Sequence, residues 1–475
     1  MKNVHVNKLM LGGLYVVWSI PVANFVINPS YSPQTWPVWL AMGVTLLFTM
    51  ADRRFFALAI PFVAMFSPLA HSDRVMGLLP SEIFLGYCAL SWLLIFLIIN
   101  KNHVNVLPGD AYLIGLVLIS FLSYLLSFEH AALLPSLLNW IALIIVFAVT
   151  RTTLRSTGLM PVYFLSLLVV AGFASALIVT GFVNGMPLVN LMTDSDNVFV
   201  DREKVQSLFR ASYFYANIFY LLGAAAVVSL VAIFTANKNI YKVISSGFLV
   251  AMLSTLFIMF AKTALVALMV CLFILVLLSF SIRRLTHKHR GVAQSLFIIF
   301  PSVLLLFVLS QITGTSDYYK FSTDSFTERL AVVSSSFEIL LQQPERLLFG
   351  FGPDASTRIS NEATDAARSS SSGIEGAIDS AYITFLFDYG LVFVVLFSLF
   401  GVHTLLRLLR LIKRNPQPQP ILINLFGVII FFYIAAISQV IGTSKVAWVI
   451  VQIFALAGIC LSRNIKDRRR VQLHT

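Results

Sequence analysis

Apolar runs of about 20 residues recur from one end of the chain to the other. Each run is long enough to cross the hydrocarbon core of a bilayer as a helix. Only 11% of the residues are charged and 58% are hydrophobic, whereas a soluble domain carries about 25% charged residues. The sequence therefore predicts an all-α polytopic membrane protein, with residues 1–475 forming a single integral membrane domain.

The apolar runs define about 14 candidate transmembrane spans. They cover residues 9–27, 36–50, 55–70, 82–99, 110–126, 131–150, 159–181, 212–235, 242–260, 264–280, 292–313, 380–402, 421–440 and 446–462. The spans over 36–50 and 55–70 are short, so hairpins or tilted pairs fit them as well as full crossings do.

The positive charges are concentrated in alternate connections, which predicts the orientation of the chain. If both termini are cytoplasmic, that side holds 22 of the 33 Lys and Arg but 3 of the 21 Asp and Glu. The formal net charge of +12 then splits into about +19 inside and −7 outside. The basic excess is a topology signal, and it requires no nucleic-acid partner.

Two of the predicted outer connections are long, over residues 182–209 and 314–379, and long loops usually carry function or disorder. In the second loop, Ser325 and Glu328 form a capping box at the start of a predicted amphipathic helix that Pro344 ends. One apolar face of that helix is predicted to hold Leu330, Val333, Phe337, Leu340 and Leu341. Gly350 and Gly352 follow the helix and favour a tight turn.

Four charged residues lie where outer loops meet predicted helices: Arg210, Lys262, Arg329 and Asp379. Charge at membrane depth is costly and is often functional. Structural roles are also open: Lys262 can extend to the interface, the arginines can contact headgroups, and Asp379 can cap a helix. We interpret Asp388, in the body of the helix after Asp379, as a buried hydrogen-bond partner.

Three cations at the outer edge fit an anionic headgroup, and a lipid diphosphate is the natural candidate because its tail needs a membrane. As a leaving group, the diphosphate supplies the energy for glycosyl transfer without ATP. A nearby carboxylate can take the proton of an incoming sugar hydroxyl. The pattern thus predicts Arg210, Lys262 and Arg329 as diphosphate ligands and Asp379 as the catalytic base, with no metal and no cofactor.

The order of motifs also resembles a known family. The motifs are RASYFYAN, AKTAL, an S-x-x-x-R in the amphipathic helix, LLFGFG and DSAYITFLFDYGL, in that order. This order resembles the superfamily of O-antigen polymerases (Wzy-type) and O-antigen ligases of the bacterial envelope. The similarity covers roughly residues 210–400.

The resemblance implies a GT-C-like membrane glycosyltransferase, metal-independent, with undecaprenyl-diphosphate-linked glycans as donor and acceptor. It places Arg210 and Arg329 on arginines that hold the donor diphosphate, and Lys262 where the family often has Ser-Arg. Asp379 falls where ligases carry a catalytic histidine. The missing histidine favours a polymerase over a ligase.

The resemblance further implies an enzyme of the bacterial inner membrane with its active face in the periplasm, and a chain-length regulator protein as a partner. A ligase-type glycan transfer is the first alternative. A flippase or other transporter of lipid-linked glycans is another alternative, although no internal repeat of the kind that such transporters show is visible.

Overall fold

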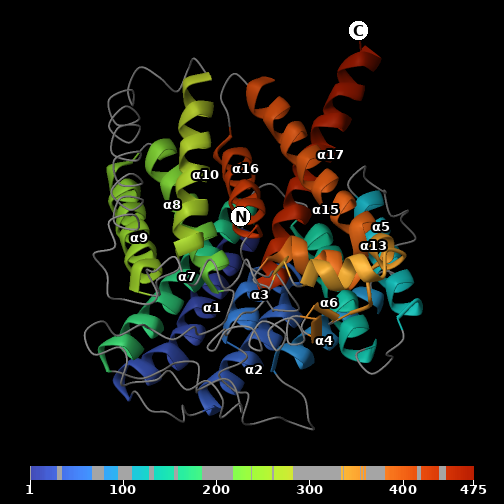
Figure 1. The fold of residues 1–475 in the computed structure, drawn as a ribbon. Helices are drawn as coiled ribbons and strands as arrows, with labels where there is room; N and C mark the ends of the chain where they lie inside the picture. The colour runs from blue at the N-terminus through green and yellow to red at the C-terminus, as the bar shows by residue number, and fades with distance from the viewer. Residues whose placement is uncertain are drawn as a thin grey trace, which may run out of the picture.

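The computed structural model describes residues 2–28, 35–66, 80–94, 110–127, 133–154, 159–184, 218–236, 238–258, 262–281, 333–334, 336–353, 355–356, 358–359, 380–414, 419–437 and 446–474. Its helices are α1 (Lys2–Ile27), α2 (Trp36–Ala51), α3 (Phe55–Phe66), α4 (Pro80–Leu94), α5 (Asp110–Leu125), α6 (Leu133–Thr153), α7 (Met160–Val183), α8 (Ile218–Thr235), α9 (Asn239–Ile258), α10 (Lys262–Ser281), α13 (Arg346–Phe349), α15 (Ala381–Arg414), α16 (Pro420–Ala435) and α17 (Val446–His474). Figure 1 shows these helices gathered into one bundle.

The all-α, multi-pass architecture predicted from the apolar runs is confirmed. No strand occurs in the described ranges, and every predicted span within them coincides with a helix. The predicted span over 292–313 lies outside the described residues. Five of the described helices are long and apolar enough to cross a membrane, in α1, α7, α8, α9 and α15. The other apolar stretches are 10–17 residues long.

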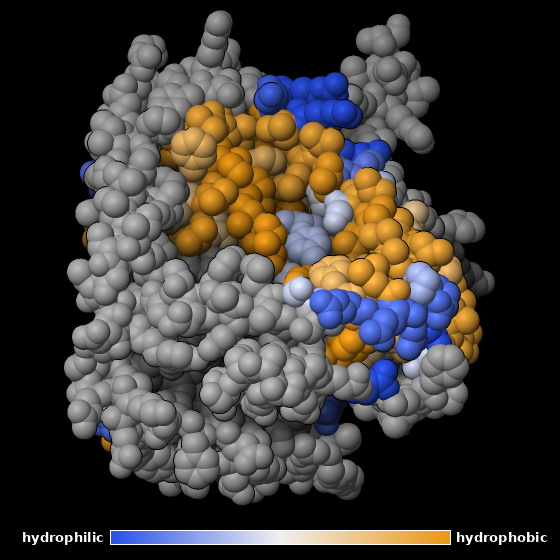
Figure 2. Space-filling model, in the orientation of Figure 1, coloured by the Kyte–Doolittle hydropathy of each residue, from blue (hydrophilic) through white to orange (hydrophobic). Residues whose placement is uncertain are grey.

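The surface has the layering expected of a membrane protein. Figure 2 shows a broad apolar face over α15 and α16 with hydrophilic residues at its upper end and near α13. On α15, one exposed apolar stripe follows the helical period. It consists of Leu391, Val395, Leu399, Val402 and Leu406. Arg410, Lys413 and Arg414 follow at the end of the helix.

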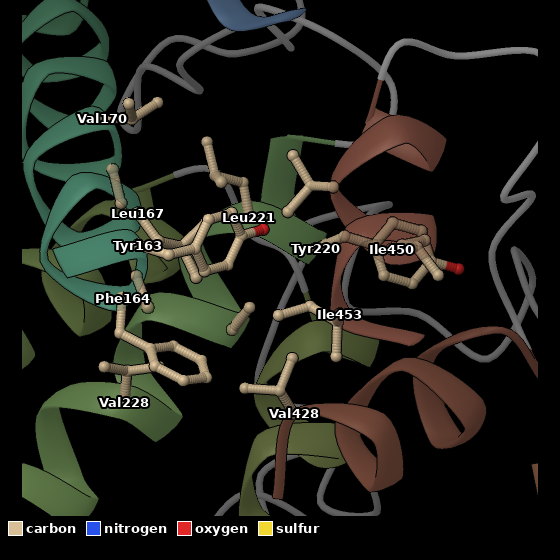
Figure 3. Close-up of a cluster of buried hydrophobic side chains, with 14 of the residues drawn as sticks. Tyr163, Phe164, Leu167, Val170, Tyr220, Leu221, Val228, Val428, Ile450 and Ile453 are labelled. Carbon is tan, nitrogen blue, oxygen red and sulfur yellow. The ribbon is translucent and has the colours of Figure 1, made fainter. Parts of the chain in front are cut away.

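The core lies where α7, α8, α16 and α17 meet (Figure 3). Tyr163, Tyr220 and Ile453 are among its fully buried side chains. α16 is central because it packs against α8, α10, α15 and α17. Gly223 of α8 allows the closest approach: a Cβ there would lie 1.9 Å from the ring of Phe431 in α16. Small residues at such contacts let membrane helices approach one another closely.

An ion pair agrees with the topology predicted from charge. Arg151, near the end of α6, pairs with Asp110 at the start of α5. The charge pattern assigns both of these helix ends to the inner face. The two helices therefore run in opposite directions, as two consecutive spans joined by an outer turn must.

Candidate functional site: a junction between the outer loop and α15

Most of the predicted site residues fall outside the described residues. Arg210, Arg329 and Asp379 do so, and the geometry of these three predictions is untested. Lys262 is the first residue of α10, directly after the short connection 259–261 that follows α9. Residues 259–261 lie outside the described residues, so the predicted helix break before Lys262 and the role of its side chain stay predictions. The predicted capping box of Ser325 and Glu328 also lies outside the described residues.

The amphipathic helix of the large loop is present in its described part, but its buried face differs from the predicted one. Residues 336–342 are helical, and a turn over 343–345 contains Pro344, as predicted. Leu340 is 1% exposed, whereas Leu341 is 73% exposed. Adjacent helical residues point about 100° apart, so Leu340 and Leu341 cannot both face the core. The predicted apolar face is wrong at Leu341, and Ser336 lies on the buried side instead. Phe337 is also partly exposed, at 36%, and Leu330 lies outside the described residues.

The helix packs on the first part of α15 and not on the main bundle. Leu340 joins Phe387 in a small cluster with Ala355 and Ile359. The ring centroids of Phe337 and Phe387 are 5.9 Å apart. This cluster holds the loop segment 336–359 against residues 383–387 of α15.

α15 is broken at Gly390, where φ is 83° and ψ is 176°. The sequence predicted one unbroken span over 380–402, but the chain bends sharply at this residue. The bend folds residues 381–389 back against the following segment. This is shown by two ring contacts: the centroids of Phe385 and Phe393 lie 5.0 Å apart, and those of Tyr382 and Phe397 lie 6.0 Å apart. Residues 391–414 alone exceed the roughly 20 residues that a helix needs to cross a bilayer.

The break frees backbone carbonyls of α15, and the outer loop supplies their donors. The backbone N–H of Phe351 donates to the carbonyl of Phe387 at 2.7 Å, and that of Gly352 donates to the carbonyl of Asp388 at 3.1 Å. The Ser123 hydroxyl of α5 donates to the same Asp388 carbonyl at 2.6 Å. Irregular backbone at membrane depth requires such partners, since no water is available there to replace them.

The Asp388 side chain holds a second part of the loop. It is 7% exposed, and its Oδ1 accepts a 2.8 Å hydrogen bond from the backbone N–H of Ser356. The interpretation of Asp388 as a buried hydrogen-bond partner is therefore confirmed. Its setting differs from the prediction, because Asp388 lies two residues before a helix break and not within a continuous helix.

The loop is also fixed to the end of α5. Arg346 is buried at the start of α13, and its guanidinium donates to the carbonyl of Leu126 at 2.6 Å. Carbonyls at the end of a helix lack partners within the helix and carry the negative end of its dipole, so they favour a cation. A Cβ on Gly352 would lie 2.4 Å from the Ser127 hydroxyl oxygen. The charge pattern assigns the end of α5 and this loop to the same outer face, as their contact requires.

The described part of α15 begins with Ser380 and Ala381, directly after Asp379 in the sequence. The N–H of Thr384 donates to the carbonyl of Ser380 at 2.8 Å. Ser380 is therefore in the N-cap position of the described helix. Asp379 lies outside the described residues, so its role as a cap stays a prediction. The N–H of Ala381 donates to the carbonyl of Ala436 just beyond α16 at 3.0 Å. Residues 381–389 thus connect the end of α16 with the end of α5.

Sequence reasoning did not identify three residues of this junction: Ser123, Arg346 and Gly390. One feature of the sequence could have indicated the break: Gly390 lies inside an apolar run. A second glycine-rich turn, in LLFGFG, is its counterpart in the loop. Both glycine motifs, LLFGFG and FDYGL, belong to the pattern from which the resemblance was read.

The match to a family model falls on this part of the chain. Residues 247–398, which include the loop and α15 sides of the junction but not the end of α5, match the family described as O-antigen ligase. This region belongs to the O-antigen polymerase and ligase superfamily. Its members are membrane enzymes that polymerise or ligate O-antigen glycans. A comparison with curated proteins found no match.

The superfamily domain runs from α9 into α15 and ends in the segment after the Gly390 break. The matched range therefore includes the end of α9, all of α10, the large loop and the Gly390 break. The protein is a multi-pass membrane protein, and its matched region supports a role in O-antigen polymerisation or ligation at this coarse level.

Proposed function

We propose that the protein polymerises lipid-linked oligosaccharide repeat units at the periplasmic face of the inner membrane, with both termini in the cytoplasm. The growing glycan is transferred from undecaprenyl diphosphate to the non-reducing end of a new undecaprenyl-diphosphate-linked repeat. The supporting feature is residue 379: the sequence has an aspartate at the position where the resemblance to the superfamily implies a histidine in ligases.

In the proposed reaction, an acceptor sugar hydroxyl attacks the anomeric carbon of the donor glycan. The Asp379 carboxylate takes the hydroxyl proton, the new glycosidic bond forms, and the bond to the diphosphate breaks. Arg210, Lys262 and Arg329 stabilise the negative charge of the departing undecaprenyl diphosphate. The reaction is GT-C-like and needs no metal, because these three cations take the role that a metal would have.

The junction gives this proposal a physical basis. Catalysis depends on positioning of the reacting groups to better than about 1 Å. The four proposed site residues lie in loops or at helix ends, so these segments must be held in fixed positions. The backbone hydrogen bonds at Phe387 and Asp388 fix the large loop to the segment that Asp379 leads into. A partner protein that regulates chain length is part of the same proposal.

The test uses the purified protein in lipid nanodiscs with the undecaprenyl-diphosphate repeat unit as the only substrate and with chelator present. The expected product is a ladder on a gel, spaced by one repeat unit. If intact substrate gives no ladder but glycan is transferred when a lipid A core acceptor is added, the protein is a ligase. The family description itself favours ligase-type transfer as the second candidate.

A further inference from the structure

The exposed apolar stripe of α15 ends in positive charge. Its members, from Leu391 to Leu406, follow one another at intervals of three or four positions, and Arg410 and Lys413 continue that spacing on the same face. At 1.5 Å per residue, Arg410 lies about 28 Å from Leu391 along the helix, and the hydrocarbon core of a bilayer is about 30 Å thick. When the apolar stripe lies in that core, Arg410 and Lys413 are therefore at the level of the lipid headgroups. Figure 2 shows hydrophilic residues at the upper end of this apolar face.

This end of α15 carries a basic cluster, which consists of Arg407, Arg410, Lys413 and Arg414. Arg407 is partly exposed, and the other three are exposed. The other side of the same turns is buried: Leu408 and Ile412 are both 0% exposed and belong to the core of the bundle. This packing fixes the rotation of the helix, so the basic cluster faces out of the protein.

Within the described part of the chain, no acidic side chain pairs with the basic cluster. The charge pattern assigns three acidic residues to the same, inner side of the membrane. Asp52 pairs with Arg54, and Asp110 pairs with Arg151. The side chain of the third, Asp467, is outside the described set. Like charges three or four positions apart on a helix destabilise it, and the members of the basic cluster have this spacing. The cluster is therefore complementary to an anion from outside the protein.

We propose that the basic cluster binds the phosphate of an anionic phospholipid of the inner leaflet, while the acyl chains of that lipid lie along the apolar stripe of α15. Arginine offers a planar pair of N–H donors that matches two phosphate oxygens, and lysine adds a point charge. A lipid is favoured over an acidic cytoplasmic protein because the cluster continues an apolar stripe, and an amphiphile contacts both.

This site goes beyond the proposed function. It lies at the opposite end of α15 from the Gly390 break and takes no part in glycosyl transfer. A phospholipid bound there holds the inner end of α15 at a fixed depth in the bilayer. Because the helix is continuous from residue 391 to residue 414, the same contact also sets the depth of the break.

The test is native mass spectrometry of the full-length protein in detergent, titrated with dioleoyl phosphatidylglycerol or with the zwitterionic dioleoyl phosphatidylcholine. We expect the unmodified protein to bind phosphatidylglycerol at least about tenfold more tightly than phosphatidylcholine. The triple variant R410Q/K413Q/R414Q should bind phosphatidylglycerol at least about tenfold more weakly than the unmodified protein does. Glutamine removes the charges but keeps a high helix propensity, so the helix itself is retained.

The matched control is R53Q/K238Q/K242Q, which removes three charges from the same predicted side of the membrane but outside α15. It should keep the affinity of the unmodified protein for phosphatidylglycerol. Equal weakening in both triple variants would reflect only the general positive charge of the inner face, and it overturns the specific site.

Unchanged binding in R410Q/K413Q/R414Q, or equal affinity of the unmodified protein for the two lipids, also overturns the proposal and leaves the cluster to an acidic protein partner. If the triple variant does not give a single peak in size-exclusion chromatography, R410Q and K413Q replace it, each with an affinity lowered about threefold. The binding measurement needs no glycan substrate and no turnover, so its result is independent of the polymer assay.

Discussion

Gly350 and Gly390 hold two distant stretches of backbone in direct contact. A Cβ on Gly350 would lie 2.5 Å from the carbonyl oxygen of Asp388, and a Cβ on Gly390 would lie 2.2 Å from that of Leu348. Both residues also have positive φ, at 74° and 83°. Each position therefore favours glycine for two reasons: its positive φ is strained for other residues, and the other segment lies too close for a side chain.

Replacing either glycine by alanine should open the junction. Gly350→Ala and Gly390→Ala each add a clash with backbone atoms and a strained φ, and we expect each to reduce stability by about 2 kcal/mol or more. The measurement is thermal unfolding of the purified protein in detergent. Gly43→Ala is the matched control, since a Cβ there meets nothing within 4 Å. Unchanged unfolding of the Gly390 variant would show that the contact does not exist.

The Asp388 side chain should be replaceable by asparagine but not by alanine. Asp388→Asn keeps an oxygen that accepts the Ser356 N–H, whereas Asp388→Ala leaves that buried donor without its acceptor. The loss should amount to about 1–3 kcal/mol. Limited proteolysis of the large outer loop measures it, with faster cleavage expected for D388A only. Equally fast cleavage of D388N would indicate that the charge, and not the hydrogen bond, matters.

The contact of Gly223 with Phe431 should appear as coupling in a double-mutant cycle. Gly223→Ala pushes against a fully buried ring, and Phe431→Ala leaves a cavity that costs about 3–5 kcal/mol. Because the smaller residue at 431 removes the clash, the double variant should be more stable than the sum of the single effects predicts, by about 1 kcal/mol or more. Thermal unfolding of all four proteins gives the coupling, and strict additivity would contradict it.

The three predicted diphosphate ligands should be essential for polymer formation but not for folding. We expect Arg210→Ala, Lys262→Ala and Arg329→Ala each to reduce polymer yield at least about 100-fold, since each removes a charge that stabilises the leaving group. Lys262→Arg should retain activity. Lys238→Ala, at the opposite end of α9, serves as the control. Full-length polymer from all three alanine variants would eliminate the headgroup hypothesis.

Asp379→Asn separates catalysis from structure. Ser380 is in the N-cap position of the described helix, and asparagine caps a helix as well as aspartate does, so the change at 379 keeps either cap. Loss of polymer with normal protein yield is expected if Asp379 is the base. Full activity of the asparagine variant in the nanodisc assay would rule out a required carboxylate at this position.

The sequence alone determined the fold class, the helix positions and the superfamily. The reason is that these depend on local quantities. A run of apolar residues must satisfy its backbone hydrogen bonds within itself in a bilayer, so helical structure over the predicted span 380–402 could be anticipated from composition. The confirmed burial of Asp388 followed from the high cost of leaving a carboxylate exposed to lipid.

Only the tertiary structure decided how the large loop and α15 meet. Hydrophobicity did not predict the break at Gly390, because it reports burial and not the direction of the chain. The glycine itself is compatible with both a continuous helix and a break. Contact with Phe387 likewise determines which side of the loop helix is buried. Leu340 packs in the cluster with Phe387 and is buried, whereas Leu341 is exposed. The donors for the freed carbonyls come from Phe351 and Gly352 in a distant loop, and no local pattern identifies such partners. The junction is a property of two segments together, and neither segment reveals it when taken alone.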